Sequence, residues 1–261
     1  MSIDGLIAEF GEQQVVGFFA VLARISPLFV LAPLFSSKLV PARVRGIVAV
    51  ALAVGLTPVV VAGAELPTDP WGLGGLIAKE LLVGAGYAFA LGALFAALQV
   101  AGSFLDTLIG FSFGGLVDPV TGNQSSVLSQ MYALVGVLIF IAIGGDAWVI
   151  QGLARTYEVV GLADAPSLGT LVAGADEAFA HIFLSAVQVA GPIMLALILT
   201  DAAFGVVSRV VPQLNVFGVG FPAKVTVGLL LLGVTLPFVG GWLSDELERS
   251  VMQALQTLKV A

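Results

Sequence analysis

The segment Thr200–Leu232 is the feature that most constrains how this chain can fold. It is apolar enough to lie at membrane depth, yet it contains four charged or amide side chains and two prolines: Asp201, Arg209, Asn215, Lys224, Pro212 and Pro222. Lipid offers no hydrogen-bond partner to an open backbone and no counterion to a single charge. We therefore predict a membrane protein that assembles around a conduit, with its helix interrupted at both prolines.

The composition excludes most other classes of protein. The chain has 261 residues, of which 59% are hydrophobic and 10% are charged, whereas soluble proteins carry roughly 25% charged residues. The net charge is −7, and there is no basic cluster, so we expect no nucleic-acid partner. With no cysteine, one histidine and none of the usual phosphate, dinucleotide or zinc motifs, we expect no enzyme activity, no cofactor and no metal.

Apolar runs of about membrane-spanning length indicate an all-α, helical integral membrane protein. Each run is close to the roughly 20 residues that cross the hydrocarbon core. The six runs are Val15–Phe35, Gly46–Gly63, Leu76–Ala101, Val127–Ile150, Ala180–Thr200 and Ala223–Leu243. The pieces Phe104–Phe113 and Ala202–Phe221 are too short or too broken to span alone. We expect kinked helical hairpins within one domain over residues 1–261.

Short amphipathic helices are predicted at both ends of the chain, over residues 1–14 and Leu243–Ala261. Each has apolar residues at helical spacing with acidic residues alongside. Either helix could rest on lipid or contact a partner. Lys38, Arg43 and Arg45 crowd the loop after the first run, which predicts a cytoplasmic position for that loop.

A ridge of small residues with a four-residue spacing lies in the third run. It consists of Glu80, Gly84, Ala88, Gly92 and Ala96. This spacing places the residues along one side of a helix. Small side chains there allow another backbone to come close, as in membrane helix association. The ridge is either an internal packing seam or a subunit interface.

Several charged residues and prolines lie inside or at the ends of apolar runs. Arg24 is in the first run, followed by Pro27 and Pro33, and it could cap carbonyls freed by these prolines or pair with a distant acid. Asp201 and Arg209 are eight residues apart, about 12 Å along a helix, which excludes a direct salt bridge within one straight helix. Asp146 and Asp201 are also conceivable proton-relay groups.

The segment Gly110–Ser126 combines helix-disfavouring glycines and turn signals with apolar side chains. It could be a connector tucked between two membrane runs. The alternative is a movable stopper, because a narrow hydrophobic constriction sheds water and blocks ions. The stopper residues would be Gly110, Phe111, Ser112, Phe113, Gly114, Gly115, Leu116, Val117, Asp118 and Pro119.

Taken in order, these features resemble the FliR family, the R subunits of the flagellar type III export gate, to which the T component of virulence injectisomes is related. The resembling residues are Arg24, Pro27 and Pro33, then Pro41, Arg43 and Arg45, then Lys79, Glu80 and Gly84, then Gly110–Phe113 with Asp118 and Pro119, then Gly144 and Gly145, and finally Asp201, Gly205, Ser208–Asn215, Phe217, Gly220 and Pro222. One departure is Asp146, where the family often has a histidine, so any role of that histidine does not carry over.

The resemblance implies a hetero-oligomeric gate in the bacterial inner membrane, within the flagellar basal body. One R chain, a P-like part followed by a Q-like part, would join several copies of FliP and FliQ in a closed cone of helical hairpins. Unfolded flagellar subunits would pass through its centre. Residues Gly110–Ser126 would form the plug of this channel, and FlhB and FlhA would be cytoplasmic-side partners.

The residues by themselves allow two other functions. A stand-alone transporter for a small solute or ion would use Asp146, Asp201 and Arg209 near the helix break at Pro212, although no repeat relates residues 15–110 to 127–243. An insertase would need an exposed polar groove, and Lys38–Arg45 is the one basic patch.

Overall fold

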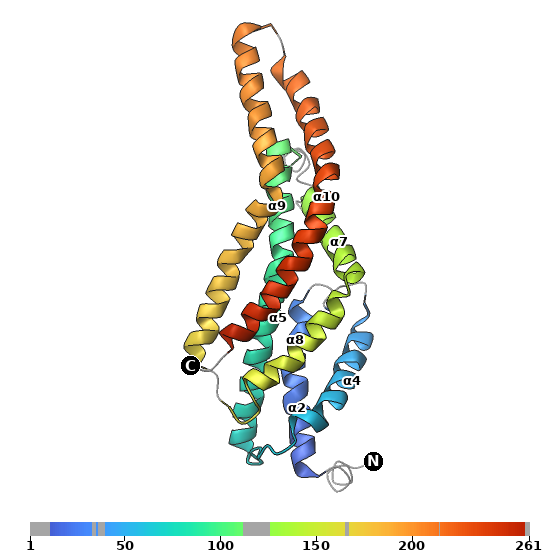
Figure 1. Ribbon diagram of the computed structural model, residues 1–261, viewed down its shortest axis with the longest axis vertical. Helices are drawn as coiled ribbons and strands as arrows, with labels where there is room; N and C mark the ends of the chain where they lie inside the picture. Colours follow the sequence, from blue (N-terminus) through green and yellow to red (C-terminus); the bar gives the residue numbers. More distant parts are fainter. Residues whose placement is uncertain are drawn as a thin grey trace, which may run out of the picture. The chain divides into compact units, whose positions relative to one another are not determined.

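The computed structural model describes residues 11–32, 35, 40–111, 126–164, 167–213 and 215–258, and all regular secondary structure in them is helical (Figure 1). The helices are α2 (Glu12–Ile25), α3 (Leu28–Leu31), α4 (Ala42–Val60), α5 (Pro70–Ile109), α7 (Val127–Ala142), α8 (Gly145–Val159), α9 (Leu168–Val210) and α10 (Val216–Thr257). Among the described residues, five helices are long and apolar enough to cross a membrane, or six if α7 and α8 count as one span. The predicted fold class is therefore confirmed.

The chain forms two compact units. Unit 1 comprises Met1–Ala93, Gly144–Phe179 and Leu247–Ala261, and unit 2 comprises Leu94–Ile143 and Ala180–Glu246. Helices α5, α9 and α10 each contribute residues to both units. Neither unit is one continuous stretch of chain. The division into a P-like part followed by a Q-like part stays a prediction.

Three helices are much longer than the apolar runs that predicted them. Helix α5 has 40 residues, α9 has 43 and α10 has 42. The pieces Phe104–Phe113 and Ala202–Phe221 are mostly the ends of α5 and α9 and the start of α10, and the predicted separate C-terminal helix is wrong because it is the end of α10. An apolar run marks where charges are scarce, whereas a helix continues until the backbone meets a stop signal, such as Gly110 after α5 with φ 102°.

The fourth apolar run is bent rather than straight. Helices α7 and α8 meet at Gly144, which has a left-handed φ of 70°, and their axes differ by 76°. Glycine adopts this conformation without the steric cost that a Cβ would bring. The expected single helix over Val127–Ile150 is therefore two helices.

The predicted interruption of the segment Thr200–Leu232 is correct at one proline and wrong at the other. Helix α9 ends at Val210, Pro212 lies in the turn, and the side chain of Asn215 accepts a hydrogen bond of 3.0 Å from Gly218 N at the start of α10. Pro222 lies inside α10 and does not break it. One proline removes a single backbone hydrogen bond, and membrane helices tolerate that loss.

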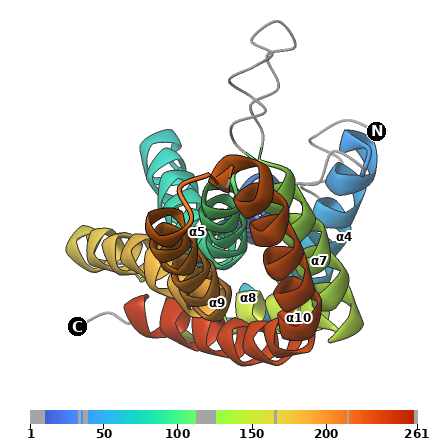
Figure 2. The ribbon, with the colours of Figure 1, turned by 90° about the horizontal axis from the view of Figure 1, so that it is seen from above.

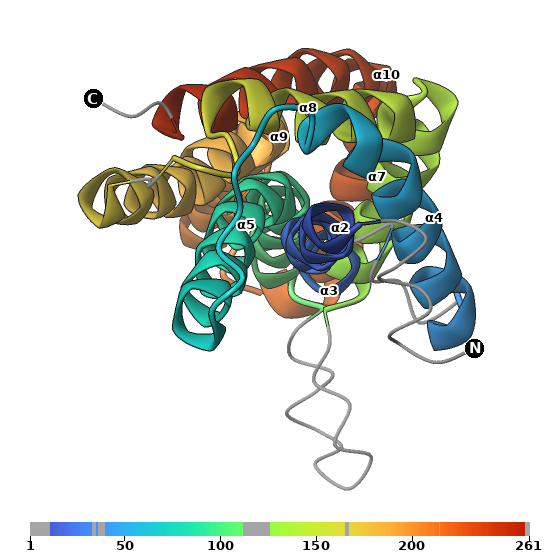
Figure 3. The same cartoon turned by 90° about the horizontal axis from the view of Figure 1, so that it is seen from below.

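Unit 1 is organised around α2. Figure 3 shows α2 with α4, α5 and α8 around it. Helix α4 buries only the stripe formed by Ala49, Ala53 and Thr57, and the rest of this helix is largely exposed. Buried apolar side chains of one cluster in this unit are Ala20, Val61, Leu66, Leu76 and Leu162.

Unit 2 is held by small residues and aromatic contacts. The rings of Phe95 in α5 and Phe140 in α7 meet edge to face, with centroids 5.4 Å apart. Gly102 lets α5 come so close to α7 that a Cβ there would lie 2.6 Å from Leu128 carbonyl atoms. The connected ends of α9 and α10 lie side by side as a hairpin (Figures 1 and 2).

We predict that Gly84→Ala destabilises the protein. A Cβ at Gly84 would overlap the backbone carbonyl of Arg24 and lie 2.8 Å from its carbon, so α2 and α5 must separate. We expect a loss of about 1–3 kcal/mol in the free energy of unfolding, measured by denaturant titration in detergent. Gly55→Ala is the matched control, because nothing lies within 4 Å of its added Cβ. Equal stabilities of the two variants would contradict close packing at Gly84.

Candidate functional site

A buried ion pair joins α2 to α5 in unit 1. Arg24 Nε donates to Glu80 Oε2 at 2.5 Å, and Arg24 Nη2 donates to Glu80 Oε1 at 3.0 Å. Both side chains are completely inaccessible to solvent. The two parallel hydrogen bonds form the bidentate geometry that a guanidinium and a carboxylate prefer. Arg24 therefore pairs with a distant acid, one of the two partners that the sequence suggested.

The same guanidinium also binds α8. Its Nη1 donates to the carbonyl of Val160 at 2.9 Å and to Thr156 Oγ1 at 3.3 Å. The guanidinium carbon lies 4.0 Å from the ring centroid of Tyr157, a cation–π distance. Arg24 therefore connects three helices through one side chain.

Lys79 binds the chain that follows α8. Its Nζ is 2.8 Å from Glu80 Oε1. It also donates to the carbonyl oxygens of Gly161 at 3.1 Å, Leu162 at 2.7 Å and Asp164 at 2.9 Å. These carbonyls lie just beyond the C-terminus of α8, an end of the helix where the helix dipole favours a cation.

We call Arg24, Lys79 and Glu80, with the four carbonyl oxygens that the two cations bind, the charge cluster. It holds two cations and one carboxylate, and the carbonyls and Thr156 Oγ1 accept further hydrogen bonds from the two cations. Breaking such a buried pair costs more than forming it gains, because one charge is left without a partner. The cluster is a cross-link between α2, α5 and α8, with its charged groups engaged within the protein rather than presented to a solute.

The predicted small-residue ridge packs within unit 1 over part of its length. Gly84 abuts the carbonyl of Arg24, Ala88 is completely buried, and a Cβ at Gly92 would lie 3.2 Å from the carbonyl oxygen of Leu31. Ala96 is partly exposed. The first four positions therefore have the geometry of an internal seam against α2 and α3, and their role between subunits stays a prediction.

The remaining charged residues of the long segment lie on the hairpin of α9 and α10. Lys224 Nζ donates to Asp201 Oδ2 at 2.9 Å, so Asp201 pairs with a residue of the next helix. Arg209 is exposed in the last turn of α9, where a cation interacts favourably with the helix dipole. Asp146 is exposed in the first turn of α8.

The predicted stopper segment lies almost entirely outside the described residues. Gly110 and Phe111 both donate backbone N–H bonds of 3.0 Å to the carbonyl of Asp106 at the end of α5. Ser112, Phe113, Gly114, Gly115, Leu116, Val117, Asp118, Pro119 and also Pro33 fall outside the described ranges. Pro27 lies at the junction of α2 and α3.

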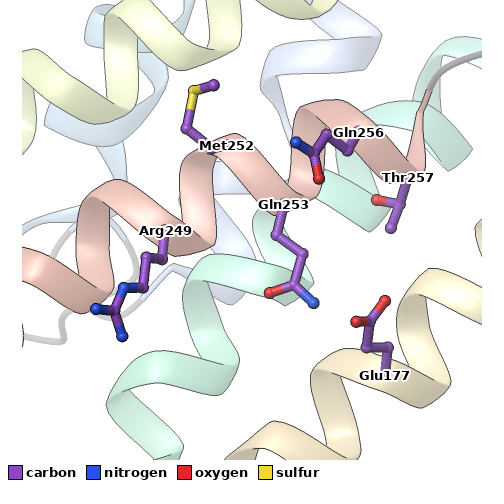
Figure 4. Close-up of a pocket in the computed structure, with 6 residues that line it drawn as sticks. All are labelled: Glu177, Arg249, Met252, Gln253, Gln256 and Thr257. Atoms are coloured by element: carbon purple, nitrogen blue, oxygen red, sulfur yellow. The ribbon is translucent and has the colours of Figure 1, made fainter.

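A polar pocket of about 500 Å³ opens in unit 1 between the start of α9 and the end of α10. Figure 4 shows Gln253 of α10 and Glu177 of α9 pointing toward each other across it. The other lining residues are Arg249, Met252, Gln256 and Thr257. Among the residues with described positions, no group of three or more His, Cys, Asp or Glu side chains is placed to hold a metal ion.

The comparison with known proteins decides the family. The model of the bacterial export proteins, family 1, matches residues 15–250. The chain is 34% identical over 232 residues to the flagellar biosynthetic protein FliR of Bacillus subtilis (strain 168), an alignment that covers 85% of this chain and 86% of that protein. The chain belongs to this family of bacterial export proteins.

Other members of the family show similar coverage. The chain is 28% identical over 222 residues to FliR of Escherichia coli (strain K12), covering 85% of each protein. It is 26% identical over 214 residues to the surface presentation of antigens protein SpaR of Shigella sonnei, covering 81% of this chain and 82% of that protein. The matched region of this export protein includes the whole charge cluster and the hairpin of α9 and α10.

Sequence reasoning missed most of the partners in the charge cluster of this export protein. It singled out Arg24 as a charge that could pair with a distant acid, and Glu80 only as part of the small-residue ridge, although their opposite charges in separate apolar runs were a usable signal. Thr156 and Tyr157 follow the fourth run without any unusual pattern. The carbonyls bound by Lys79 have no sequence signal, because every residue carries a carbonyl.

We predict that Glu80→Met strongly destabilises the protein, because it leaves buried Arg24 without its counterion. The expected loss in the free energy of unfolding is about 3–5 kcal/mol. The double variant Arg24→Met, Glu80→Met removes both charges from the pair and should recover most of this loss. Denaturant titration of Arg24→Met, Glu80→Met, the double variant and the wild type in detergent measures the coupling. A single variant as stable as the wild type would refute the importance of this pair.

Proposed function

We propose that the chain is a structural, non-enzymatic subunit of the flagellar type III protein export gate in the bacterial inner membrane. It would help to form and plug the channel through which unfolded flagellar subunits leave the cytoplasm. Its partners would be FliP and FliQ within the gate and FlhB and FlhA on the cytoplasmic side. Membership of the bacterial export family supports this proposal.

The length of the apolar helices is the observation that carries the proposal of a multi-subunit assembly. Helix α9 has 43 residues, and so extends about 64 Å at 1.5 Å per residue, against about 30 Å of hydrocarbon in a bilayer. Exposed apolar side chains occur along its whole length, from Val172 to Val210. To fit within the hydrocarbon, this helix would have to tilt by about 60°, beyond the usual range of 0–40°.

Part of this apolar surface must therefore be covered by protein rather than by lipid. Helix α10 adds further exposed apolar side chains, such as Val219, Leu230 and Phe238, over a stretch of about one hydrocarbon thickness. Neighbouring helices of sister subunits would supply the missing cover. A gate built from helical hairpins has this property, whereas a protein that lies alone in a bilayer does not.

The names of the relatives favour a flagellar role over an injectisome role. The Bacillus subtilis FliR protein is 34% identical to the chain, and the Shigella SpaR proteins are 25% and 26% identical. A carrier for small solutes fits less well, because Asp201, one of its expected binding residues, is occupied by Lys224.

Co-purification tests this proposal. We expect the tagged chain, expressed with FliP and FliQ and extracted in mild detergent, to yield a discrete complex whose intact mass contains one copy of the chain. The chain expressed alone should aggregate or be degraded, since its long apolar faces then lack cover. A stable monomer that shows no association with FliP or FliQ would overturn the proposal.

Deleting residues 111–117 tests the stopper. We expect the variant gate to assemble and to let ions through the membrane, because the apolar side chains that exclude water are gone. The measurement is the growth and membrane potential of cells that express the complete gate. A variant with serine at Phe111, Phe113, Leu116 and Val117 keeps the loop length and should leak as well. Unchanged permeability in an assembled deletion variant would exclude a stopper.

A further inference from the structure

The first turns of α9 have little burial to hold them in place. None of residues 168–179 is buried, although they belong to compact unit 1. Leu171 packs beside the buried residues Val83, Val160 and Leu258 but remains partly exposed. A stretch with so few buried apolar contacts is expected to open easily unless something else restrains it.

The chain just before α9 is restrained by hydrogen bonds instead. Lys79 Nζ binds the carbonyls of Gly161, Leu162 and Asp164, and Arg24 binds the carbonyl of Val160. The N–H of Gly161 also donates to Asp164 Oδ2 at 2.8 Å, which closes the turn. The four carbonyl oxygens bound by two cations therefore tie the stretch 160–164 to α2 and α5.

We propose that Lys79, supported by Arg24, is a positioning residue that fixes where α9 starts against α5. Four Cα–Cα steps separate Asp164 from Leu168, the first residue of α9, which limits their distance to about 14 Å. Hydrogen bonds from a charged donor are stronger than those between neutral groups, and the Glu80 carboxylate lies 2.8 Å from the Lys79 ammonium. The anchored stretch therefore limits how far the first turns of α9 can move from α5, and burial alone does not hold these turns in place.

The absence of cysteine makes the position of α9 measurable by disulfide formation. A Cβ at Gly86 in α5 would lie 3.6 Å from Leu171 Cδ2 in α9, an ordinary contact. The pair Gly86→Cys, Leu171→Cys therefore reports how often α9 lies on α5. The pair Leu31→Cys, Gly92→Cys is the control, because it joins α3 to the same helix α5, where the Cβ of position 92 would meet the Leu31 carbonyl.

The experiment compares three substitutions in each cysteine pair, in the full chain and in membranes that contain the complete assembly. Lys79→Met removes the ammonium at similar length and should slow the Gly86–Leu171 disulfide by at least about tenfold, the cost of losing one charge-assisted bond. The Leu31–Gly92 disulfide should form at its normal rate. Lys79→Arg restores the positive charge and should recover most of the rate.

The variant Leu162→Ala tests whether the hydrogen bonds of Lys79 or apolar burial sets the position of α9. Leu162 is buried in the apolar cluster of unit 1, but Lys79 binds its carbonyl, which this substitution keeps. We expect the Gly86–Leu171 disulfide to form nearly as fast as in the parent chain. If Leu162→Ala slows it more than Lys79→Met does, burial rather than Lys79 positions α9 and the proposal is wrong. If Lys79→Met prevents folding and abolishes both disulfides, Leu162→Ala decides the case alone: a slow Gly86–Leu171 disulfide beside a normal Leu31–Gly92 disulfide overturns the proposal.

Discussion

The bond between Arg24 and Glu80 is the constraint on which unit 1 depends. Both charges lie where no water reaches them, so each is tolerable only while the other is in place. That requirement brings α2 against α5 closely enough that Gly84 cannot carry a side chain. The same guanidinium donates hydrogen bonds to Val160 and Thr156 at the end of α8, and Lys79 binds the residues that lead into α9. The Glu80 carboxylate and the two cations that it binds thus connect α2, α5, α8 and the residues that lead into α9.

The outer surface of the protein carries many exposed apolar side chains. Helices α4, α9 and α10 display many exposed apolar side chains, and those of α9 extend over about twice the thickness of hydrocarbon. Such helices are unsuited to a protein that works alone, because apolar surface outside lipid must be covered by other protein. Membership of the bacterial export family and this surplus of apolar surface both support the proposal that neighbouring subunits cover the exposed helices.

Hydropathy predicted where the helices lie but not how long or how straight they are. The helical membrane fold and the break at Pro212 follow from local rules. The break at Pro222 does not occur, since one proline near the beginning of a long helix removes only one hydrogen bond. The bend at Gly144 was missed, because a glycine pair within an apolar run is compatible with either a straight or a bent helix until packing selects a left-handed φ. The apolar face predicted for the C-terminal tail is real, yet Leu247, Val251 and Leu258 bury it within this chain rather than on lipid.

The order of residues alone establishes a membrane protein with about six helical runs, because hydrophobic length and charge scarcity are properties of local sequence. It also marks Arg24 as a charge that needs a partner at membrane depth. It does not specify the carbonyls of Val160, Gly161, Leu162 and Asp164 as those partners. A hydrogen bond to a backbone oxygen depends on where the chain passes, not on which side chain it carries, and that path emerges only when α2, α5 and α8 have packed together.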